Sequence, residues 1–287
     1  MKSLLGYYGG KAGPSGGWIT AQLPPHEIYV EPFGGMCGVL MQKRPSKVEV
    51  YNDQESALYN LLTVVRDQHE ALRAALMLTP YSRKEFLQCV KTVNEAGISP
   101  VEWARRAYVV LAMSRNGSLG NTSFSFGGPK FKGSVADGFV NGQERIPAVA
   151  ERLRRVTLEC GNWERVCTQW DSLQTLIYFD PPYTLDSRNS RGNYSQELKA
   201  GEHLAILDWC RRAESKIVLS GYRNELYRQE LEVAAGWVRR DFLTVAHTSA
   251  QRDKVSRASR VESIWLSPRA AAATPSLFCK VREEVLA

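Results

Sequence analysis

The apolar segment 175–179, which ends directly at Asp180, constrains the fold more than any other part of this sequence. A strand that is apolar at nearly every position is typical of a parallel strand buried on both faces of a sheet. Segment 216–220 is expected to be the next strand, and a segment with a helical pattern, 198–212, lies between the two. This alternation predicts an α/β fold built on a mostly parallel sheet.

A strand, turn and strand arrangement also lies near the N-terminus. A β-rich segment, 28–30, runs into the turn Glu-Pro-Phe-Gly-Gly at 31–35, and a second strand, 48–51, ends just before Asp53. The apolar segment 36–41 between them is expected to form a helix. Strand, glycine turn, helix, strand and acidic residue in this order are typical of a nucleotide-binding βαβ unit, in which the acid follows the glycines by about 20 residues and binds a ribose.

The middle of the chain has a different pattern. From 61 to 112 apolar residues recur at three- and four-residue spacing, which predicts helices. Segment 114–142 then holds several Gly- and Asn-containing turn dipeptides between β-forming residues, which predicts a hairpin with long loops. Such a loop-rich insertion is a natural recognition element. The alternative is an ordinary surface loop without a role in recognition. The last strand is expected at 262–266, and the chain after 268 is expected to be peripheral.

Composition excludes several classes of protein. With 44% hydrophobic and 23% charged residues among 287, the chain is neither disordered nor a collagen or coiled coil. No apolar run has the roughly 18 residues that a membrane span needs, and the N-terminus lacks the apolar segment of a signal peptide. The six cysteines include no C-x-x-C pair, and the four histidines do not cluster with them. We therefore expect a cytoplasmic protein with free thiols, no metal and no membrane contact.

Basic residues exceed acidic ones, giving a formal net charge of +7 at pH 7. The excess is strongest in segment 239–260 and milder in 103–160, and a local excess of this kind suits a surface that faces phosphates. Solvated surface charge is the alternative interpretation. The basic residues of the two segments include Arg105, Arg106, Arg115, Lys130, Lys132, Arg152, Arg154, Arg155, Arg239, Arg240, Arg252, Lys254, Arg257 and Arg260.

The segment Asp180-Pro181-Pro182-Tyr183 is the strongest indication of a functional site in the sequence. It follows a buried strand, and ligands of open α/β sheets bind beyond the carboxyl ends of their strands. Two consecutive prolines remove two N–H donors and stiffen the backbone, so that the turn presents carbonyl and carboxylate acceptors. Tyr183 adds a flat ring for stacking. Acceptors beside a stacking ring suit an exocyclic amino group on a planar base.

The ordered set of motifs resembles the DNA adenine methylase family, the N6-adenine methyltransferases, and particularly its phage and prophage members. The resemblance covers nearly the whole chain and rests on Tyr7-Tyr8-Gly9-Gly10-Lys11, Glu31-Pro32-Phe33-Gly34-Gly35, Asn52-Asp53, Asp180-Pro181-Pro182-Tyr183, Lys216-Ile217-Val218-Leu219-Ser220-Gly221-Tyr222 and Glu262-Ser263-Ile264-Trp265. It implies a Rossmann-like S-adenosylmethionine-dependent methyltransferase sheet with an inserted, mainly helical target-recognition domain. The expected catalytic domain comprises 1–60 and 157–267, the recognition domain 61–156, and a C-terminal tail 268–287.

The resemblance also implies a cofactor site. Lys11 is expected to meet the methionine carboxylate of S-adenosylmethionine, Asp53 the ribose hydroxyls, and Asn162 the adenine ring. Met36 and Cys37 stand where the glycine turns of the family often continue with more glycine, so the geometry of this turn is left open. The expected cofactor-binding residues are Tyr7, Lys11, Glu31, Phe33, Gly34, Gly35, Asp53, Asn162 and Asp180.

The implied reaction is methyl transfer to the N6 amino group of adenine in double-stranded DNA, by direct in-line displacement after base flipping. Asp180 and the carbonyl of Pro181 would accept the two amino hydrogens, Pro182 would stiffen the turn, and Tyr183 would stack on the base. Candidate DNA contacts are Arg115, Asn116, Lys130, Lys132, Arg252, Lys254 and Arg257. The expected setting is a monomer or weak dimer in a bacterial or phage-infected cell, in restriction–modification or phage anti-restriction.

Other functions remain as alternatives. Cytosine-N4 methyltransferases use similar geometry but usually carry Ser where this chain has Asp180, and RNA or protein-glutamine methylation uses a related motif that typically begins with Asn. A nicotinamide dehydrogenase would need G-x-G-x-x-G after the first strand, and the glycines at 34, 35 and 38 do not supply that spacing. A DNA-binding protein that has lost catalysis is the alternative from a different class, and cofactor turnover distinguishes it.

Overall fold

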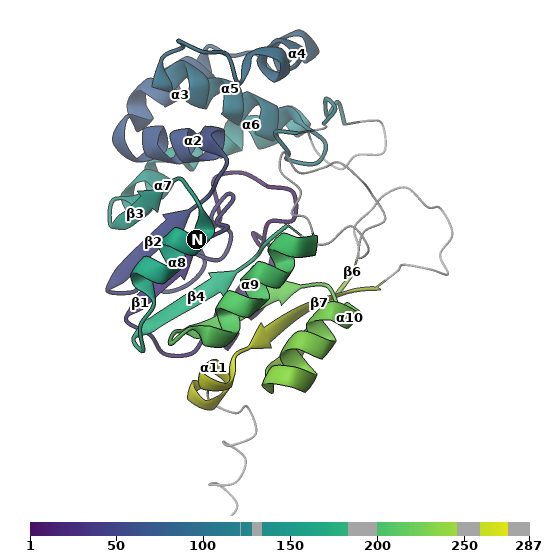
Figure 1. The fold of residues 1–287 in the computed structure, drawn as a ribbon. Coiled ribbons are helices and arrows are strands. Elements are labelled where there is room, and N and C mark those ends of the chain that lie inside the picture. The colour runs from purple at the N-terminus through teal and green to yellow at the C-terminus, as the bar shows by residue number, and fades with distance from the viewer. Residues whose placement is uncertain (121, 128–133, 183–199, 246–258, 275–287) are drawn as a thin grey trace, which may run out of the picture.

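The computed structural model describes the chain except residues 121, 128–133, 183–199, 246–258 and 275–287. Its centre is one sheet with the strand order β3-β2-β1-β4-β5-β7-β6 (Figure 1). β1 to β5 run parallel, whereas β7 is antiparallel to both of its neighbours. The strands are β1 (Ile28–Glu31), β2 (Val48–Asn52), β3 (Val156–Glu159), β4 (Thr175–Phe179), β5 (Lys216–Gly221), β6 (Val238–Val245) and β7 (Ser259–Leu266).

The strand order reverses between β1 and β4, which are hydrogen-bonded neighbours although more than 140 residues separate them in the sequence. Ligands of open α/β sheets bind at such a reversal, beyond the carboxyl ends of the strands. Here those ends lead into the turn 31–35 and into Asp180. The sheet thus brings together the two segments that the sequence singles out.

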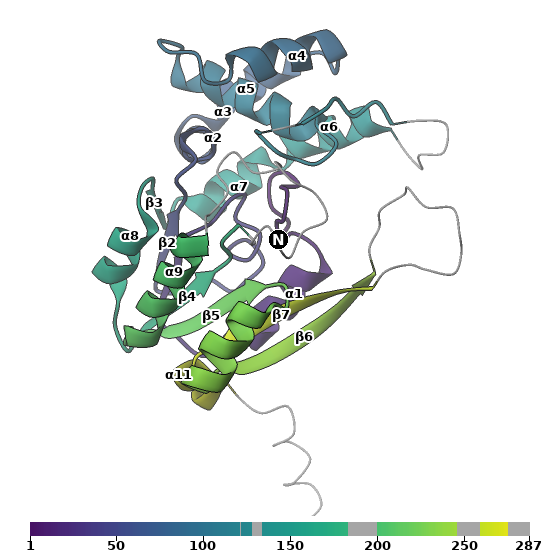
Figure 2. The same ribbon diagram turned by 45° about the vertical axis from the view of Figure 1, so that its right-hand side comes forward.

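Two apolar cores lie on opposite faces of the sheet, because alternate residues of a strand point to opposite sides. On one face Ile177 and Phe179 pack against α8 (Trp163–Trp170) and α9 (Ala200–Arg212), and α10 (Glu225–Tyr227) lies on the same side (Figure 1). On the other face Tyr178 belongs to the larger core. Helix α1 (Pro14–Gln22) lies against β6 on that side (Figure 2), and α11 (Pro268–Ala273) packs against β5.

A stack of helices rises from one end of the sheet (Figure 1). Helix α5 lies at its centre and contacts α2, α3, α4 and α6 through buried residues that include Ala104, Tyr108 and Leu111. Ser82, Ser99 and Ser134 each accept a hydrogen bond at the start of α4, α5 and α6, which fixes where these helices begin. The helices are α2 (Ser56–Asp67), α3 (His69–Met77), α4 (Arg83–Thr92), α5 (Pro100–Met113), α6 (Val135–Glu144) and α7 (Ile146–Leu153).

Two expectations about local structure are wrong. Segment 36–41 forms consecutive turns rather than a helix, because Gly35 and Cys37 have φ angles of +50° and +58°, outside the helical region. Segment 114–142 is not an extended hairpin in its described part. It contains a single antiparallel bridge between Ser114 and Phe124, and α6 begins at Val135.

Helix α11 modifies a third expectation. Its Ala270 is fully buried and its N-cap Ser267 bonds the amide of Ile217, so part of the chain after 268 belongs to the core. Among the residues that the structure describes, no helix is long and apolar enough to span a membrane.

Candidate active site

One pocket lies at the carboxyl ends of β1 and β4. It is lined by the N-terminal segment, the turns after β1 and β2, the start of the turn after β4, and the beginning of α9. Its lining residues include Tyr7, Lys11, Glu31, Phe33, Gly34, Gly35, Asp53, Glu55, Asp180, Pro182 and Glu202. Seven of the predicted cofactor-binding residues outside the catalytic turn therefore share one cavity with Asp180.

The glycine turn is shaped by close contacts that only glycine permits. A Cβ on Gly34 would overlap the ring of Tyr51, and a Cβ on Gly35 would lie 2.9 Å from the ring of Tyr7. The amide of Gly35 donates to Asp53 at 2.8 Å, and the Tyr51 hydroxyl donates to the carbonyl of Gly35 at 3.0 Å. The two tyrosines and the aspartate thus hold the turn in a left-handed conformation.

Asp53 also accepts a hydrogen bond from the amide of Glu55. Burial of the carboxyl raises the pKa of Asp53 to about 6, although the two amide bonds favour the charged form. A carboxylate in this place accepts hydrogen bonds and donates none, so it suits a ligand that presents hydroxyl donors.

Asp180 is fixed by a hydrogen-bonded network. Lys11 Nζ donates to both carboxylate oxygens at 2.9 Å, and Ser220 Oγ donates to Oδ1 at 2.7 Å. The Tyr178 hydroxyl donates in turn to Ser220 Oγ at 3.0 Å. Lys11, Ser220 and Tyr178 are buried, whereas the Asp180 side chain keeps 16% of its surface exposed. The network therefore holds the carboxylate in one orientation at the edge of the pocket.

Glu31 is a third carboxyl group in the pocket, and it is buried. Its Oε2 accepts hydrogen bonds from the Tyr29 hydroxyl at 3.1 Å and from the amide of Leu40 at 3.2 Å. Burial raises the pKa of Glu31 to about 8, and the nearby charge of Asp180 acts in the same direction. Glu31 is therefore largely protonated at neutral pH.

The pocket carries more acidic than basic groups. Its lining includes five carboxyl side chains and the single ammonium group of Lys11. That ammonium group is engaged by Asp180, by the carbonyl of Gly9 at 3.0 Å and by Glu262 at 3.4 Å. Because Glu31 is largely protonated, the other four carboxyl groups set the balance, and they still outnumber the one ammonium group. This balance favours a ligand with positive charge. The five carboxyl groups belong to Glu31, Asp53, Glu55, Asp180 and Glu202.

Two predicted cofactor residues have other neighbours than those expected. The sequence interpretation assigned a ligand carboxylate to Lys11, whereas its ammonium group contacts Asp180 in the structure. Asn162 does not line the pocket. Its side-chain oxygen accepts the amides of Glu164 and Arg165 at the start of α8. Of the residues that follow Asp180, Pro182 lines the pocket, Pro181 is buried, and Tyr183 lies outside the described residues.

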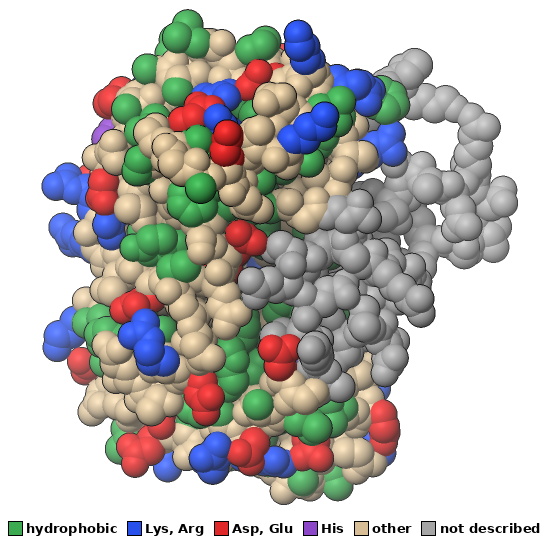
Figure 3. Space-filling model, turned by 45° about the horizontal axis from the view of Figure 1, so that its top comes forward, with side chains coloured by type: hydrophobic (Ala, Val, Ile, Leu, Met, Phe, Trp, Pro, Cys, Tyr) green, Lys and Arg blue, Asp and Glu red, His purple; other side chains and the backbone are tan. Residues whose placement is uncertain are grey.

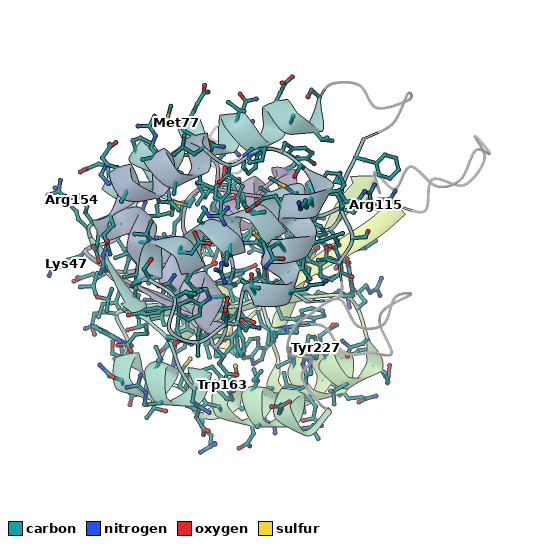
Figure 4. All side chains as sticks on the ribbon, turned by 90° about the horizontal axis from the view of Figure 1, so that it is seen from above. Lys47, Met77, Arg115, Arg154, Trp163 and Tyr227 are labelled. Atoms are coloured by element: carbon teal, nitrogen blue, oxygen red, sulfur yellow. The ribbon has the colours of Figure 1, made fainter. Side chains whose placement is uncertain are left out.

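Arg115 and Asn116 are the predicted DNA contacts that the structure describes. The exposed Arg115 guanidinium group lies 5.2 Å from the centre of the Phe126 ring, at the edge of the molecule (Figure 4). Asn116 Oδ1 accepts a hydrogen bond from Thr122 Oγ1 at 2.7 Å. The other predicted contacts lie outside the described residues, namely Lys130, Lys132, Arg252, Lys254 and Arg257.

Several residues of the predicted basic surface are used inside the protein instead. The ion pairs join Arg105 to Glu85 and Glu102, Arg106 to Glu95 and Glu102, Arg152 to Glu49, and Arg239 to Glu232 and Asp241. The four arginine side chains are between 11% and 23% exposed, so they offer little surface to a phosphate. Figure 3 shows basic and acidic side chains interspersed over one face. The excess of basic residues in these segments therefore overstates the phosphate-facing surface.

Sequence reasoning missed four residues around the turn that begins at Asp180. Ser220 and Tyr178 were assigned only to strands, and Glu262 only to a motif, although all three belong to the Asp180–Lys11 network. His203 was excluded as a metal ligand, yet its ring contacts the carbonyl of Pro182. Alternation along β4 could have placed Tyr178 on the same side as Asp180. No sequence signal indicates the contact of His203.

Comparison with known proteins agrees with this geometry. The family model described as D12 class N6 adenine-specific DNA methyltransferase matches residues 7–241, which confirms the resemblance. A comparison with curated proteins finds no match. The family model covers most of the pocket lining and the whole helical stack. The chain therefore belongs to the D12 class of N6 adenine-specific DNA methyltransferases.

Proposed function

We propose that the chain binds S-adenosylmethionine in the pocket described above and transfers its methyl group to the N6 nitrogen of an adenine in double-stranded DNA. The observation that carries the proposal is that Asp180 lies in the wall of the same pocket as Gly35 and Asp53. A carboxylate that can activate an amino group and a turn that can hold a nucleoside then share one cavity. When bound, the cofactor supplies an electrophilic methyl group on its sulfonium.

The residues present fit this cofactor. Asp53 offers acceptor oxygens for the ribose hydroxyls, and the Phe33 ring offers an apolar surface in the pocket for a base. The acidic lining favours the sulfonium and ammonium charges. The amide of Gly35 donates to Asp53 Oδ2 at 2.8 Å and so helps to hold this carboxylate in place.

The chemistry required of the protein is activation of a poor nucleophile. The N6 lone pair of adenine is delocalised into the ring, so the amino group must be drawn toward tetrahedral geometry. The Asp180 carboxylate and the Pro181 carbonyl would accept its two hydrogens and stabilise the positive charge that develops on nitrogen. The Lys11 and Ser220 hydrogen bonds hold the carboxylate ready for this contact.

The base must leave the duplex to reach such a site, because its amino group is inaccessible within the stack. We propose that Tyr183 stacks on the extruded adenine, which contributes on the order of 1–3 kcal/mol. Segment 61–156 is proposed as the target-recognition domain. Arg115, Asn116, Lys130 and Lys132 are proposed to contact DNA from this domain. Arg252, Lys254 and Arg257 are proposed to contact DNA from outside it.

Nucleoside mass spectrometry of unmethylated plasmid DNA, incubated with the protein and S-adenosylmethionine, tests the proposal. N6-methyladenine is expected, and Asp180→Asn should lower its rate of formation by about 10²–10³-fold or more. Asp208→Asn is the matched control, because Asp208 is an exposed aspartate paired with Arg212 on α9. N4-methylcytosine would overturn the base assignment, and full activity of Asp180→Asn would overturn the mechanism.

Cofactor binding has its own test. Asp53→Asn should weaken binding of S-adenosylmethionine, measured by titration calorimetry, by about tenfold, because an amide nitrogen replaces one acceptor oxygen. Wild-type affinity should fall as the pH drops below about 6, where Asp53 takes up a proton. Unchanged affinity in Asp53→Asn would place the ribose elsewhere.

A further inference from the structure

A buried histidine contacts the D-P-P turn, which we define as residues 180–182. His203 lies in the first turns of α9 and is 1% exposed. Its Nε2 lies 2.9 Å from the carbonyl oxygen of Pro182, and its Nδ1 lies 3.1 Å from the hydroxyl oxygen of Tyr227. The proposed function assigns no role to His203 or Tyr227.

The partners of the ring define its protonation. A carbonyl oxygen can only accept a hydrogen bond, so Nε2 of His203 carries the hydrogen and donates to Pro182. In the neutral ring Nδ1 is then an acceptor, and the Tyr227 hydroxyl donates to it. Tyr227 lies on the inner side of α10 (Figure 4) and packs edge-on against Trp265, with ring centres 5.1 Å apart. The Nδ1 side of the His203 ring is therefore held by Tyr227, which is itself fixed by its packing against Trp265.

The contact fixes a backbone angle that the sequence leaves free. The proline ring restricts φ of Pro181 and Pro182, so at each of these two residues the soft angle is ψ. A hydrogen bond to the carbonyl oxygen of Pro182 restricts rotation about its Cα–C bond. That rotation sets the direction in which the chain leaves Pro182. Asp180 is fixed at the other end of the turn by Lys11 and Ser220.

We propose that His203 is a positioning residue for methyl transfer: by donating from Nε2 to the Pro182 carbonyl, it holds the D-P-P turn in the geometry that receives the target base. This inference rests on the proposed function and adds a residue to it. His203 touches neither reactant and acts only through the main chain of the turn. Its loss should therefore lower the rate of the chemical step and leave cofactor affinity unchanged.

Two polar substitutions separate the role of Nε2 from simple packing. The amide nitrogen of Gln can take the place of Nε2, whereas the shorter Asn side chain reaches only the place of Nδ1. Under single-turnover conditions on plasmid DNA, His203→Gln should form N6-methyladenine within about threefold of the wild-type rate. His203→Asn and His203→Leu should be about 10- to 100-fold slower, because small misplacements near reacting groups have effects of that size.

A matched control lies at the opposite end of the sheet. His26 Nδ1 lies 2.7 Å from the carbonyl oxygen of Pro24, just before β1, so it is also a histidine bonded to a proline carbonyl. His26→Leu should leave the single-turnover rate unchanged. Titration with S-adenosylmethionine should give the same dissociation constant, within about twofold, for the wild type and all three His203 variants.

The outcomes are decisive in either direction. Wild-type activity of His203→Leu, or equal loss in His203→Gln and His203→Asn, would overturn the positioning role. Loss of cofactor affinity in parallel with rate would also overturn it, because that pattern indicates a general structural defect. If His203→Leu does not fold, the Gln and Asn pair still decides. Absence of N6-methyladenine with the wild type would instead reject the proposed function itself.

Discussion

Lys11 Nζ lies 2.9 Å from each carboxylate oxygen of Asp180, although 169 positions separate the two residues in the sequence. The contact joins the N-terminal segment to the end of β4 across the pocket. Both groups are largely removed from water, so each depends on the other for compensation of its charge. Lys11 therefore has two roles: it lines the pocket, and it holds the Asp180 carboxylate in position.

Lys11→Met should lower both stability and activity. Removing one partner of a buried ion pair leaves an uncompensated charge, so we expect a loss on the order of 3 kcal/mol in the free energy of unfolding. Methyl transfer should fall by at least 100-fold, because Asp180 loses the donor shared by its two oxygens. Denaturant unfolding and single-turnover methylation measure the two effects.

The exposed pair Lys47–Glu27 provides the control for this substitution. Their side chains are 76% and 61% exposed and 3.4 Å apart, so Lys47→Met should change stability by less than about 1 kcal/mol. The double variant Lys11→Met, Asp180→Asn should be less destabilised than the sum of its single variants. Strict additivity would show that the two groups do not interact energetically.

Ser220→Ala and Tyr178→Phe should have unequal effects. Ser220→Ala removes one of the two donors to Asp180 Oδ1, the other being Lys11, and leaves the buried Tyr178 hydroxyl without its acceptor. We expect about a tenfold loss of the methylation rate and a loss of about 1–2 kcal/mol in stability. Tyr178→Phe preserves the contact of Ser220 with Asp180, so its rate should stay within about threefold of wild type. A larger effect of Tyr178→Phe would contradict this order of roles.

Glu31→Gln should change how stability depends on pH. The pKa of Glu31 is raised from 4.5 to about 8, so between these values the folded state binds a proton that the unfolded state has lost. The free energy of unfolding therefore falls as the pH rises from about 4.5 to 8. Glu31→Gln lacks this loss and should be more stable than wild type at pH 9 by a few kcal/mol, with little difference at pH 5.

Denaturant unfolding at pH 5, 7 and 9 measures this effect. Glu27→Gln serves as the matched control, because Glu27 is an exposed glutamate just before the same strand. It should show the same pH dependence as the wild type. A constant difference between Glu31→Gln and wild type at all three pH values would mean that Glu31 does not titrate in this range.

The sequence predicted the parts of the sheet that depend on local pattern. β1, β2, β4 and β5 lie where runs of β-forming residues predicted strands, and the signal was clearest for β4, which is apolar at nearly every position. β3 and β6 were missed. The burial of β3 is partial and β6 carries Arg239, Arg240 and Asp241, so neither has the pattern of a buried strand.

The candidate site was predictable only in part, for a related reason. Motif order indicated the glycine turn, Asp53 and Asp180, because each of them belongs to a short motif of consecutive residues that can be recognised in the sequence. The contacts of Ser220 and His203 depend instead on how β5 and α9 pack against β4. The shape of the turn after Gly35 was also missed, since tertiary contacts place Cys37 at a positive φ that local pattern does not reveal.

Gly34→Ala should destabilise the protein and weaken cofactor binding together. The added Cβ would overlap the Tyr51 ring, and that ring cannot withdraw without breaking the bond from its hydroxyl to the Gly35 carbonyl. Overpacking of this kind lowers stability by about 1–3 kcal/mol. Gly201→Ala is the opposite control, because nothing lies within 4 Å of its added Cβ in α9 and removal of a helical glycine should stabilise the protein by about 0.5–1 kcal/mol. Thermal unfolding with and without S-adenosylmethionine measures both effects. A Gly34→Ala protein with wild-type stability and an unchanged cofactor-induced shift would show that the turn can move away from Tyr51.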